Sequence, residues 1–223
     1  ALVGGLLLGE KLSRHEGANI GVLLPNLVAT ALVIYGVLMF RKVPVLLNYS
    51  GGPRALRHSM ELAGLKVIVT SRVFLERVKI DPGVFEDARV IYLEDLKASI
   101  GAGDKLRAIL RSVFPGGLAR VSDGDHKGPA AILFTSGSEG LPKGVLLSHE
   151  NIIANIWQAL SRIDVGTGDY FLNALPIFHS FGLTIGVFLP LFAGARSFLY
   201  VSPLHYRVVP EIAYEEGCTV LMG

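Results

Sequence analysis

The sequence predicts an α/β protein whose sheets are mostly parallel and carry helices on both faces. Short apolar runs of strand length alternate with helical stretches along the 223 residues, and this alternation is typical of parallel sheets that are covered on both sides. The chain is 51% hydrophobic, which is enough for a substantial core in one domain or one and a half.

Strands are expected where apolar runs end at glycine or polar residues, and helices where longer stretches show helical periodicity. The expected strands cover residues 20–24, 43–47, 67–70, 89–93, 130–135, 145–147, 170–174, 196–200 and 219–221. The expected helices cover residues 2–13, 27–41, 54–63, 149–163, 181–191 and 203–216.

Residues 20–40 contain no charged side chain over a length that can cross a bilayer. Pro25 and Asn26 interrupt this run after a short strand, and the remaining residues 27–40 are too few to span a membrane. We therefore expect a buried crossover helix between two parallel strands. The apolar residues 2–8 lack the basic leader and cleavage site of a signal peptide, and the single cysteine suits a reducing compartment, so a cytoplasmic location is predicted.

Residues 98–128 have the weakest periodicity and much of the Gly, Asp and Lys punctuation, so they are the best candidate for an internal linker. Within them, residues 104–114 place apolar side chains on one helical face and basic side chains off it. Such a helix more often docks on its own domain, and the alternative is a helix that lies on an anionic membrane. The apolar residues are Leu106, Ile109, Leu110, Val113 and Phe114, and the basic ones are Lys105, Arg107 and Arg111.

The most informative segment is residues 135–144, a flexible loop rich in hydroxyl groups and glycine that ends in a lysine. Glycines let backbone N–H groups turn toward an anion, hydroxyl groups add donors, and the lysine supplies a positive charge. Because one expected strand enters the loop and another leaves it, we interpret the segment as a phosphate-binding loop. Its candidate ligand-binding residues are Thr135, Ser136, Gly137, Ser138, Glu139, Gly140 and Lys143.

The loop is not the phosphate loop of the common NTPases. That motif requires a glycine before the lysine and a serine or threonine after it, whereas Pro142 precedes Lys143 and Gly144 follows it. The expected strand–loop–strand arrangement also differs from a strand–loop–helix arrangement, in which phosphate lies at a helix N-terminus.

Residues 135–144 resemble the signature loop of the adenylate-forming superfamily, which includes acyl-CoA synthetases, acyl-ACP synthetases, peptide-synthetase adenylation domains and luciferases. That loop reads approximately Thr-Ser-Gly-Thr-Thr-Gly-x-Pro-Lys-Gly. The main departure is Glu139, whose carboxylate would repel a triphosphate unless it points away or faces a metal ion.

A second segment, residues 175–182, is similar to the superfamily's Pro-x-Phe-His-x-x-Gly element, in which the histidine and its aromatic neighbours line the acyl and adenylate site. The resemblance therefore implies catalytic roles for Lys143 and His179. It also implies substrate contacts for His179, Phe181 and Gly182.

Within the superfamily, residues 136–149 are most similar to the acyl-ACP synthetase part of 2-acylglycerophosphoethanolamine acyltransferases and to fatty acyl-CoA synthetases. This resemblance implies an ATP-dependent ligase that converts a fatty acid to acyl-AMP and passes the acyl group to acyl-carrier protein or CoA. It also implies a role in phospholipid acyl-chain metabolism, with the parent protein at the cytoplasmic face of the inner membrane. Mg²⁺ accompanies ATP, and we expect its protein ligand outside this segment.

The superfamily's later elements do not occur in residues 1–223: the Gly-Tyr-Gly-x-Thr-Glu segment, the ribose-binding aspartate and the C-terminal domain with its lysine. The chain is therefore expected to be the N-terminal portion of an AMP-binding domain and to be inactive alone. The alternative is a catalytically inert nucleotide-binding regulatory or scaffold domain.

Other chemistries find no support in the sequence. A net charge of +2 without a basic run gives no reason to expect a nucleic-acid partner. No histidine has an aspartate five positions later, as the His-x-x-x-x-Asp site of a glycerolipid acyltransferase would need, and no His-Glu-x-x-His or Gly-x-Ser-x-Gly motif is present. His149 and Asn151 are interpreted as capping the helix after the loop, with a role in steadying the loop as the alternative.

Overall fold

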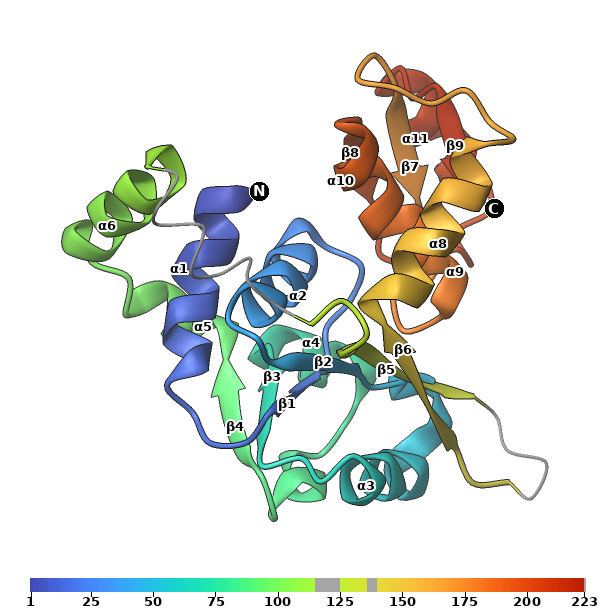
Figure 1. Ribbon diagram of the computed structural model, residues 1–223. Coiled ribbons are helices and arrows are strands. Elements are labelled where there is room, and N and C mark those ends of the chain that lie inside the picture. Colours follow the sequence, from blue (N-terminus) through green and yellow to red (C-terminus); the bar gives the residue numbers. More distant parts are fainter. Residues whose placement is uncertain (115–124, 136–139, 223) are drawn as a thin grey trace. The chain divides into compact units, whose positions relative to one another are not determined.

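A computed structural model describes residues 1–114, 125–135 and 140–222 of the protein. The chain forms two compact units (Figure 1). The first comprises Ala1–Leu24 and Leu32–Leu147, and the second comprises Pro25–Ala31 and Ser148–Gly223. Residues 25–31 thus belong to the second unit although the segments on both sides of them belong to the first.

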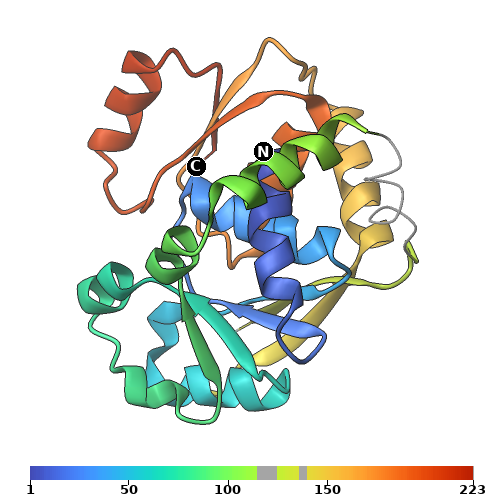
Figure 2. The same cartoon turned by 90° about the vertical axis from the view of Figure 1, so that its left-hand side faces the viewer.

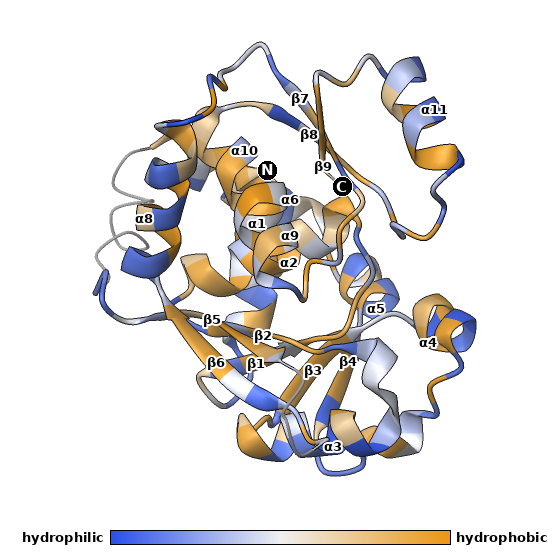
Figure 3. Cartoon of the chain, turned by 90° about the vertical axis from the view of Figure 1, so that its right-hand side faces the viewer, coloured by the Kyte–Doolittle hydropathy of each residue, from blue (hydrophilic) through white to orange (hydrophobic). Residues whose placement is uncertain are grey.

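The first unit is built on a six-stranded sheet with the order β4-β3-β1-β2-β5-β6. The pairs β1–β2, β1–β3, β2–β5 and β3–β4 are parallel, with Val22 opposite Leu46 and Val45 opposite Ile132. Figure 3 shows hydrophobic residues along β1, β2 and β3, as expected for strands that are covered on both faces. The strands are β1 (Asn19–Val22), β2 (Val43–Leu46), β3 (Val67–Thr70), β4 (Arg89–Tyr92), β5 (Pro129–Thr135) and β6 (Lys143–Ser148).

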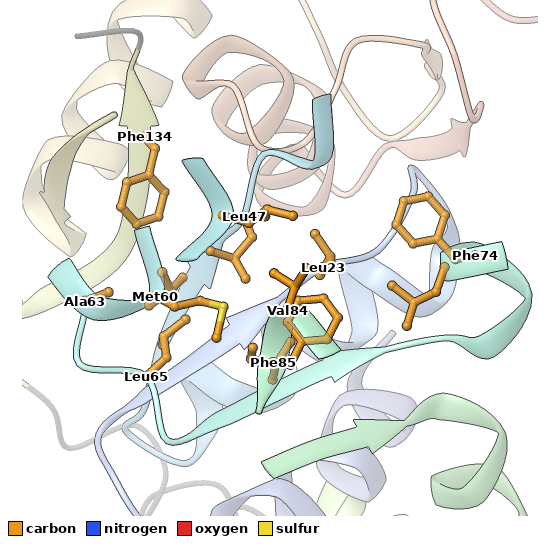
Figure 4. Packing of buried hydrophobic residues seen from close by; sticks show 13 residues of the cluster. Leu23, Leu47, Met60, Ala63, Leu65, Phe74, Val84, Phe85 and Phe134 are labelled. Atoms are coloured by element: carbon orange, nitrogen blue, oxygen red, sulfur yellow. The ribbon is translucent and has the colours of Figure 1, made fainter. Parts of the chain in front are cut away.

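Helices cover both faces of this sheet, with α1 and α2 on one side and α3 on the other (Figure 1). The core under α3 and α4 holds buried side chains from the strands, the helices and the turn η2, including Leu23, Met60, Phe85 and Phe134 (Figure 4). The helical elements are α1 (Leu2–Ser13), α2 (Val28–Met39), η1 (Tyr49–Gly51), α3 (Gly52–Leu62), α4 (Arg72–Val78), η2 (Pro82–Phe85), α5 (Leu93–Ala98) and α6 (Ala102–Val113).

Helix α6 packs along α1 through its charged side (Figure 2). Arg107 and Arg111 pair with Glu10 at 2.6 and 3.3 Å, and Asp104 pairs with Lys11 at 3.0 Å. The helix therefore docks on its own unit, as expected, but its apolar face is exposed. Its exposed side chains are Leu106, Ile109, Leu110, Val113 and Phe114.

The second unit is built on a three-stranded parallel sheet with the order β8-β7-β9. Val209 of α11 belongs to one buried cluster with Leu172 and Ala174, against which Ile212 also packs. Between α9 and α10 the chain makes one π-helical turn, η3. The elements are α8 (His149–Leu160), β7 (Tyr170–Asn173), α9 (Ser180–Leu183), η3 (Thr184–Phe188), α10 (Leu189–Ala193), β8 (Arg196–Leu199), α11 (Val208–Glu215) and β9 (Val220–Met222).

The predicted α/β class and the crossover helix between parallel strands are confirmed, since α2 connects β1 to β2. The helix predicted over residues 181–191 is divided among α9, η3 and α10. The linker candidate, residues 98–128, contains α6 and lies inside the first unit, whereas the units divide at Leu147–Ser148 and around Pro25–Ala31. Among the described residues, none of the helices combines the length and the hydropathy needed to cross a bilayer.

Candidate functional site

The phosphate-binding loop predicted from the sequence connects two neighbouring strands of the first sheet. Strand β5 has a mostly buried interior and ends at Thr135, which is exposed, and β6 begins at Lys143, which is also exposed. Because β5 and β6 are adjacent in the sheet, both residues flank one loop. The predicted ligand residues Ser136, Gly137, Ser138 and Glu139 lie outside the described residues.

Gly140 is exposed and has a φ of +85°, in the region that glycine adopts without the steric cost of a side chain. Apart from its chain neighbours, none of the described residues places a heavy atom within 4 Å of the position that a Cβ would take there. A hydroxyl group, an open glycine and an ammonium group are thus exposed where two adjacent strands meet the loop. This set of donors fits a polyphosphate, which needs several donors and positive charge without displacement of a packed core.

The second predicted element, residues 175–182, follows β7 in the second unit. His179 and Phe181 are exposed, and the imidazole of His179 lies 4.7 Å from the ring of Phe178, centroid to centroid. Gly182 is buried, and a Cβ on it would lie 2.3 Å from the carbonyl oxygen of Pro176. A close backbone approach therefore explains glycine at this position, and its substrate contact stays a prediction.

Two asparagines to which the sequence analysis assigned no role in the site bind the backbone of this segment. Asn26 is 2% exposed; its Nδ2 donates to the carbonyl oxygen of Leu175, and its Oδ1 accepts from the N–H of Ile177 at 3.0 Å. Asn173 is fully buried; it donates to the carbonyl oxygen of Gly182 and accepts from the N–H of Leu175, both at 3.1 Å. The sequence signal for them was weak: Asn26 follows Pro25 shortly after the first strand, and Asn173 is a polar residue at the end of an apolar strand.

The structure thus gathers the predicted site residues in two groups. Thr135, Gly140 and Lys143 belong to the loop of the first unit, whereas His179, Phe181 and Gly182 share one short segment of the second unit.

The helix after the loop is capped by Ser148 and Asn151. The Ser148 hydroxyl accepts from the N–H of Asn151 at 3.1 Å, and the Asn151 side chain accepts from the N–H of Ser148 at 3.0 Å. The predicted cap is therefore correct for Asn151, but the N-cap residue is Ser148, and His149 is already the first residue of the helix.

The cysteine of the chain contributes to packing in the second unit. Cys218 packs against the cluster around Leu172, and burial raises the pKa of its thiol, which disfavours the nucleophilic thiolate; Glu216 acts in the same direction. In the part of the chain that the structure describes, no three histidine, cysteine or carboxylate side chains gather closely enough to hold a metal ion.

Comparison with characterised proteins gives CoA ligases among the relatives. The chain is 29% identical over 213 residues to a probable 4-coumarate–CoA ligase 3 of Dictyostelium discoideum, which covers 84% of this chain and 36% of the ligase. It is 47% identical over 94 residues to a medium-chain fatty-acid–CoA ligase of Escherichia coli, which covers 42% of this chain and 16% of the relative. The chain thus spans about a third of the length of the first of these relatives.

The fold matches that of o-succinylbenzoate coenzyme A synthetase from Bacillus subtilis, whose structure was solved in complex with ATP and a magnesium ion. The TM-score is 0.74 at 18% identity, and the match covers 98% of this chain and 54% of the synthetase. The family model described as AMP-binding enzyme matches residues 6–223. The chain therefore belongs to the AMP-binding enzyme family.

Proposed function

We propose that the chain is part of an ATP-dependent fatty-acid ligase that activates a carboxylate as acyl-AMP and passes the acyl group to a thiol carrier. The observation that carries the proposal is the loop between the adjacent strands β5 and β6. In a chain of the AMP-binding family, this loop presents Thr135, Gly140 and Lys143 at an exposed position.

In the proposed reaction, a carboxylate oxygen attacks the α-phosphate of ATP and pyrophosphate leaves. Fatty carboxylates are already ionised near neutral pH, so the attack needs no proton removal, and catalysis consists mainly of positioning and charge stabilisation. Lys143 would hold the β- and γ-phosphates together with the hydroxyl groups and N–H groups of residues 135–140. Mg²⁺ would neutralise part of the triphosphate charge, through ligands outside residues 1–223.

His179 and Phe181 would shape the pocket where the acyl group meets the adenylate. Both side chains are exposed on a segment whose backbone is held by buried groups, so they are free to contact a substrate. No step of the proposed reaction requires His179 as a base. Its role is therefore shape and hydrogen bonding.

A fatty acid is the favoured substrate because the stretch of 94 residues at 47% identity belongs to a medium-chain fatty-acid–CoA ligase. The thiol carrier is CoA or acyl-carrier protein, and with the carrier protein the product would serve phospholipid acyl-chain metabolism. Parallel assays of the intact enzyme with each carrier distinguish these two roles.

The test of the function is carboxylate-dependent ATP–pyrophosphate exchange by the intact enzyme that contains this chain. We expect exchange with fatty acids, and none from purified residues 1–223, because the adenylate-forming resemblance assigns the ribose contact, the metal contact and a further lysine to later elements. ATP binding without exchange in the intact enzyme would instead support an inert nucleotide-binding domain. Lys105→Ala, which removes an exposed lysine of α6, is the matched control for substitutions of Lys143.

A further inference from the structure

Residues 174–179 leave the sheet after β7, and their backbone groups need hydrogen-bond partners outside a strand ladder. Pro176 lies in the middle of this stretch and has no N–H to donate. The peptide groups on both sides of Pro176 are therefore the ones whose partners decide the path of the chain toward His179.

Asn26 supplies those partners from a position about 150 residues earlier in the chain. Its amide accepts from the N–H of Ile177 and donates to the carbonyl oxygen of Leu175, so one side chain satisfies one backbone group on each side of Pro176. This pairing imitates one step of a strand ladder. All three residues of these contacts belong to the second unit, because residues 25–31 are part of it.

Asn173 joins the two ends of the same segment. Its amide accepts from the N–H of Leu175 just after β7 and donates to the carbonyl oxygen of Gly182 in α9. The tip between these two anchor points carries Phe178, His179, Ser180 and Phe181. The N–H of His179 also donates to the carbonyl oxygen of Pro176 at 3.0 Å, which tightens the turn directly before the exposed imidazole.

The Asn173 amide packs so closely against Gly186 that no side chain fits at position 186. A Cβ on Gly186, in the π-helical turn η3, would lie 2.0 Å from Nδ2 of Asn173. Glycine at position 186 is therefore necessary for the asparagine to reach Gly182. Single π-helical turns inside helices are uncommon and often mark functional sites, which agrees with a turn shaped around this amide.

We infer that Asn26 and Asn173 are positioning residues that place His179 and Phe181 for the acyl substrate by fixing the backbone of residues 174–182. Both residues are almost fully buried, each amide makes one donated and one accepted hydrogen bond, and these four bonds join them to one short segment. Buried amides are costly unless they are paired, so loss of either leaves the paired backbone groups without a substitute. The statement that His179 and Phe181 contact an acyl substrate rests on the function proposed above. The fixing of the backbone by the two amides does not depend on that function.

The first test measures hydrogen exchange of the peptide covering residues 174–183 in the intact protein. We expect exchange about tenfold faster in Asn26→Ala and Asn173→Ala, because the amides of Leu175 and Ile177 lose their acceptors. Asn19→Ala is the matched control, since Asn19 also donates from its side chain to a backbone carbonyl, that of Ala63 at 2.8 Å, in the first unit. Unchanged exchange in Asn26→Ala, or an equal increase in the control, would overturn the inference. Asn26→Ala decides the outcome alone if Asn173→Ala does not fold.

The second test separates positioning from folding. We expect kcat/KM for the carboxylate to fall about 10²-fold in Asn26→Ala while the Kd for ATP changes less than about twofold, because a small displacement of contact groups is costly. Asn26→Asp keeps the acceptor for Ile177 but places a carboxylate oxygen against the carbonyl oxygen of Leu175, so its loss should be at least as large as that of Asn26→Ala. Faster backbone exchange with wild-type kcat/KM would refute the positioning role. Absence of pyrophosphate exchange in the wild type would refute the proposed function. The hydrogen-exchange experiment would still show whether Asn26 and Asn173 fix the backbone of residues 174–182.

Discussion

The two candidate site segments are held in place in different ways. The loop after β5 takes its position from two adjacent strands, and the residues with functional chemistry are contiguous with those strands. The segment after β7 takes its position from buried side chains, one of which lies about 150 residues earlier in the chain. A contiguous motif can therefore identify both segments, but it explains the geometry of the first only.

The largest effect is expected at Lys143, where the function lies in the side chain itself. Lys143→Ala in the intact enzyme should lower kcat/KM for adenylate formation. The expected loss of transition-state stabilisation is about 2–4 kcal/mol, as for loss of one preorganised charge-stabilising donor. The measurement is ATP–pyrophosphate exchange, with Lys105→Ala as control. Unchanged exchange in Lys143→Ala would remove the loop from the mechanism.

A substitution of His179 tests whether the second segment acts by placement. His179→Ala should reduce carboxylate use by about 10²-fold through lost positioning, and His179→Gln should restore part of it, because glutamine keeps a hydrogen-bonding group. The measurement is kcat/KM as a function of pH for the wild type and both variants. A proton-transfer role would be indicated if His179→Gln were as inactive as His179→Ala and the wild type required a group that titrates near pH 6.5.

Gly182→Ala tests how tightly the second segment is closed. The added methyl would lie 2.3 Å from the Pro176 carbonyl oxygen, so we expect about 1–3 kcal/mol of lost stability together with reduced carboxylate use. Thermal unfolding and kcat/KM report the two effects. The comparison substitution is Gly140→Ala, where the space is open and the cost arises only from the positive φ.

Ser148→Ala affects the start of α8, directly after the strand that leaves the phosphate-binding loop. Loss of this N-cap should cost about 1 kcal/mol of stability, because the N–H of Asn151 loses its acceptor. If the cap only stabilises the helix, pyrophosphate exchange measured well below the unfolding temperature stays at the wild-type level. A selective rise in the KM for ATP would instead support a role of the cap in steadying the loop.

The smallest effect concerns the start of β7. The Asp169 carboxylate accepts from the N–H of Gly166 at 2.9 Å and from the Thr219 hydroxyl at 2.7 Å, and these bonds lower its pKa. A lowered folded-state pKa contributes stability above the unfolded-state pKa, and this contribution is lost as the pH falls through the folded-state value. The difference in Tm between wild type and Asp169→Asn should therefore be constant at neutral pH and shrink below about pH 4. A difference that does not depend on pH would contradict this assignment.

Much of the fold was predictable because strands β1, β2 and β3 are buried along nearly their whole length. Strand β3 was predicted with its observed bounds, since Val67, Ile68 and Val69 form an apolar run with a clear end. Helices α4 and α5 were missed because they are short and depend on each other. The N–H of Arg72 at the start of α4 donates to the Glu94 carboxylate in α5, and so does the Ser71 hydroxyl.

The candidate site was predictable only as far as its local motifs extend. The loop and the His179 segment were found from contiguous residues, whereas the roles of Asn26 and Asn173 arise from contacts across the second unit that leave no periodic signal. The π-helical turn was missed for the same reason, because Gly186 is explained by the Asn173 amide and not by its neighbours in the sequence.

The assignment of residues 25–31 to the second unit affects how this protein can be recombined. A chimera that exchanged residues from Ser148 onward with those of a relative would keep its own Asn26 beside a foreign loop after β7. Where the foreign loop carries insertions or substitutions, its backbone groups would no longer match the donor and the acceptor of the Asn26 amide. Residues 25–31 and the segment from Ser148 onward form one inheritable module, although more than 100 residues of the first unit separate them in the chain.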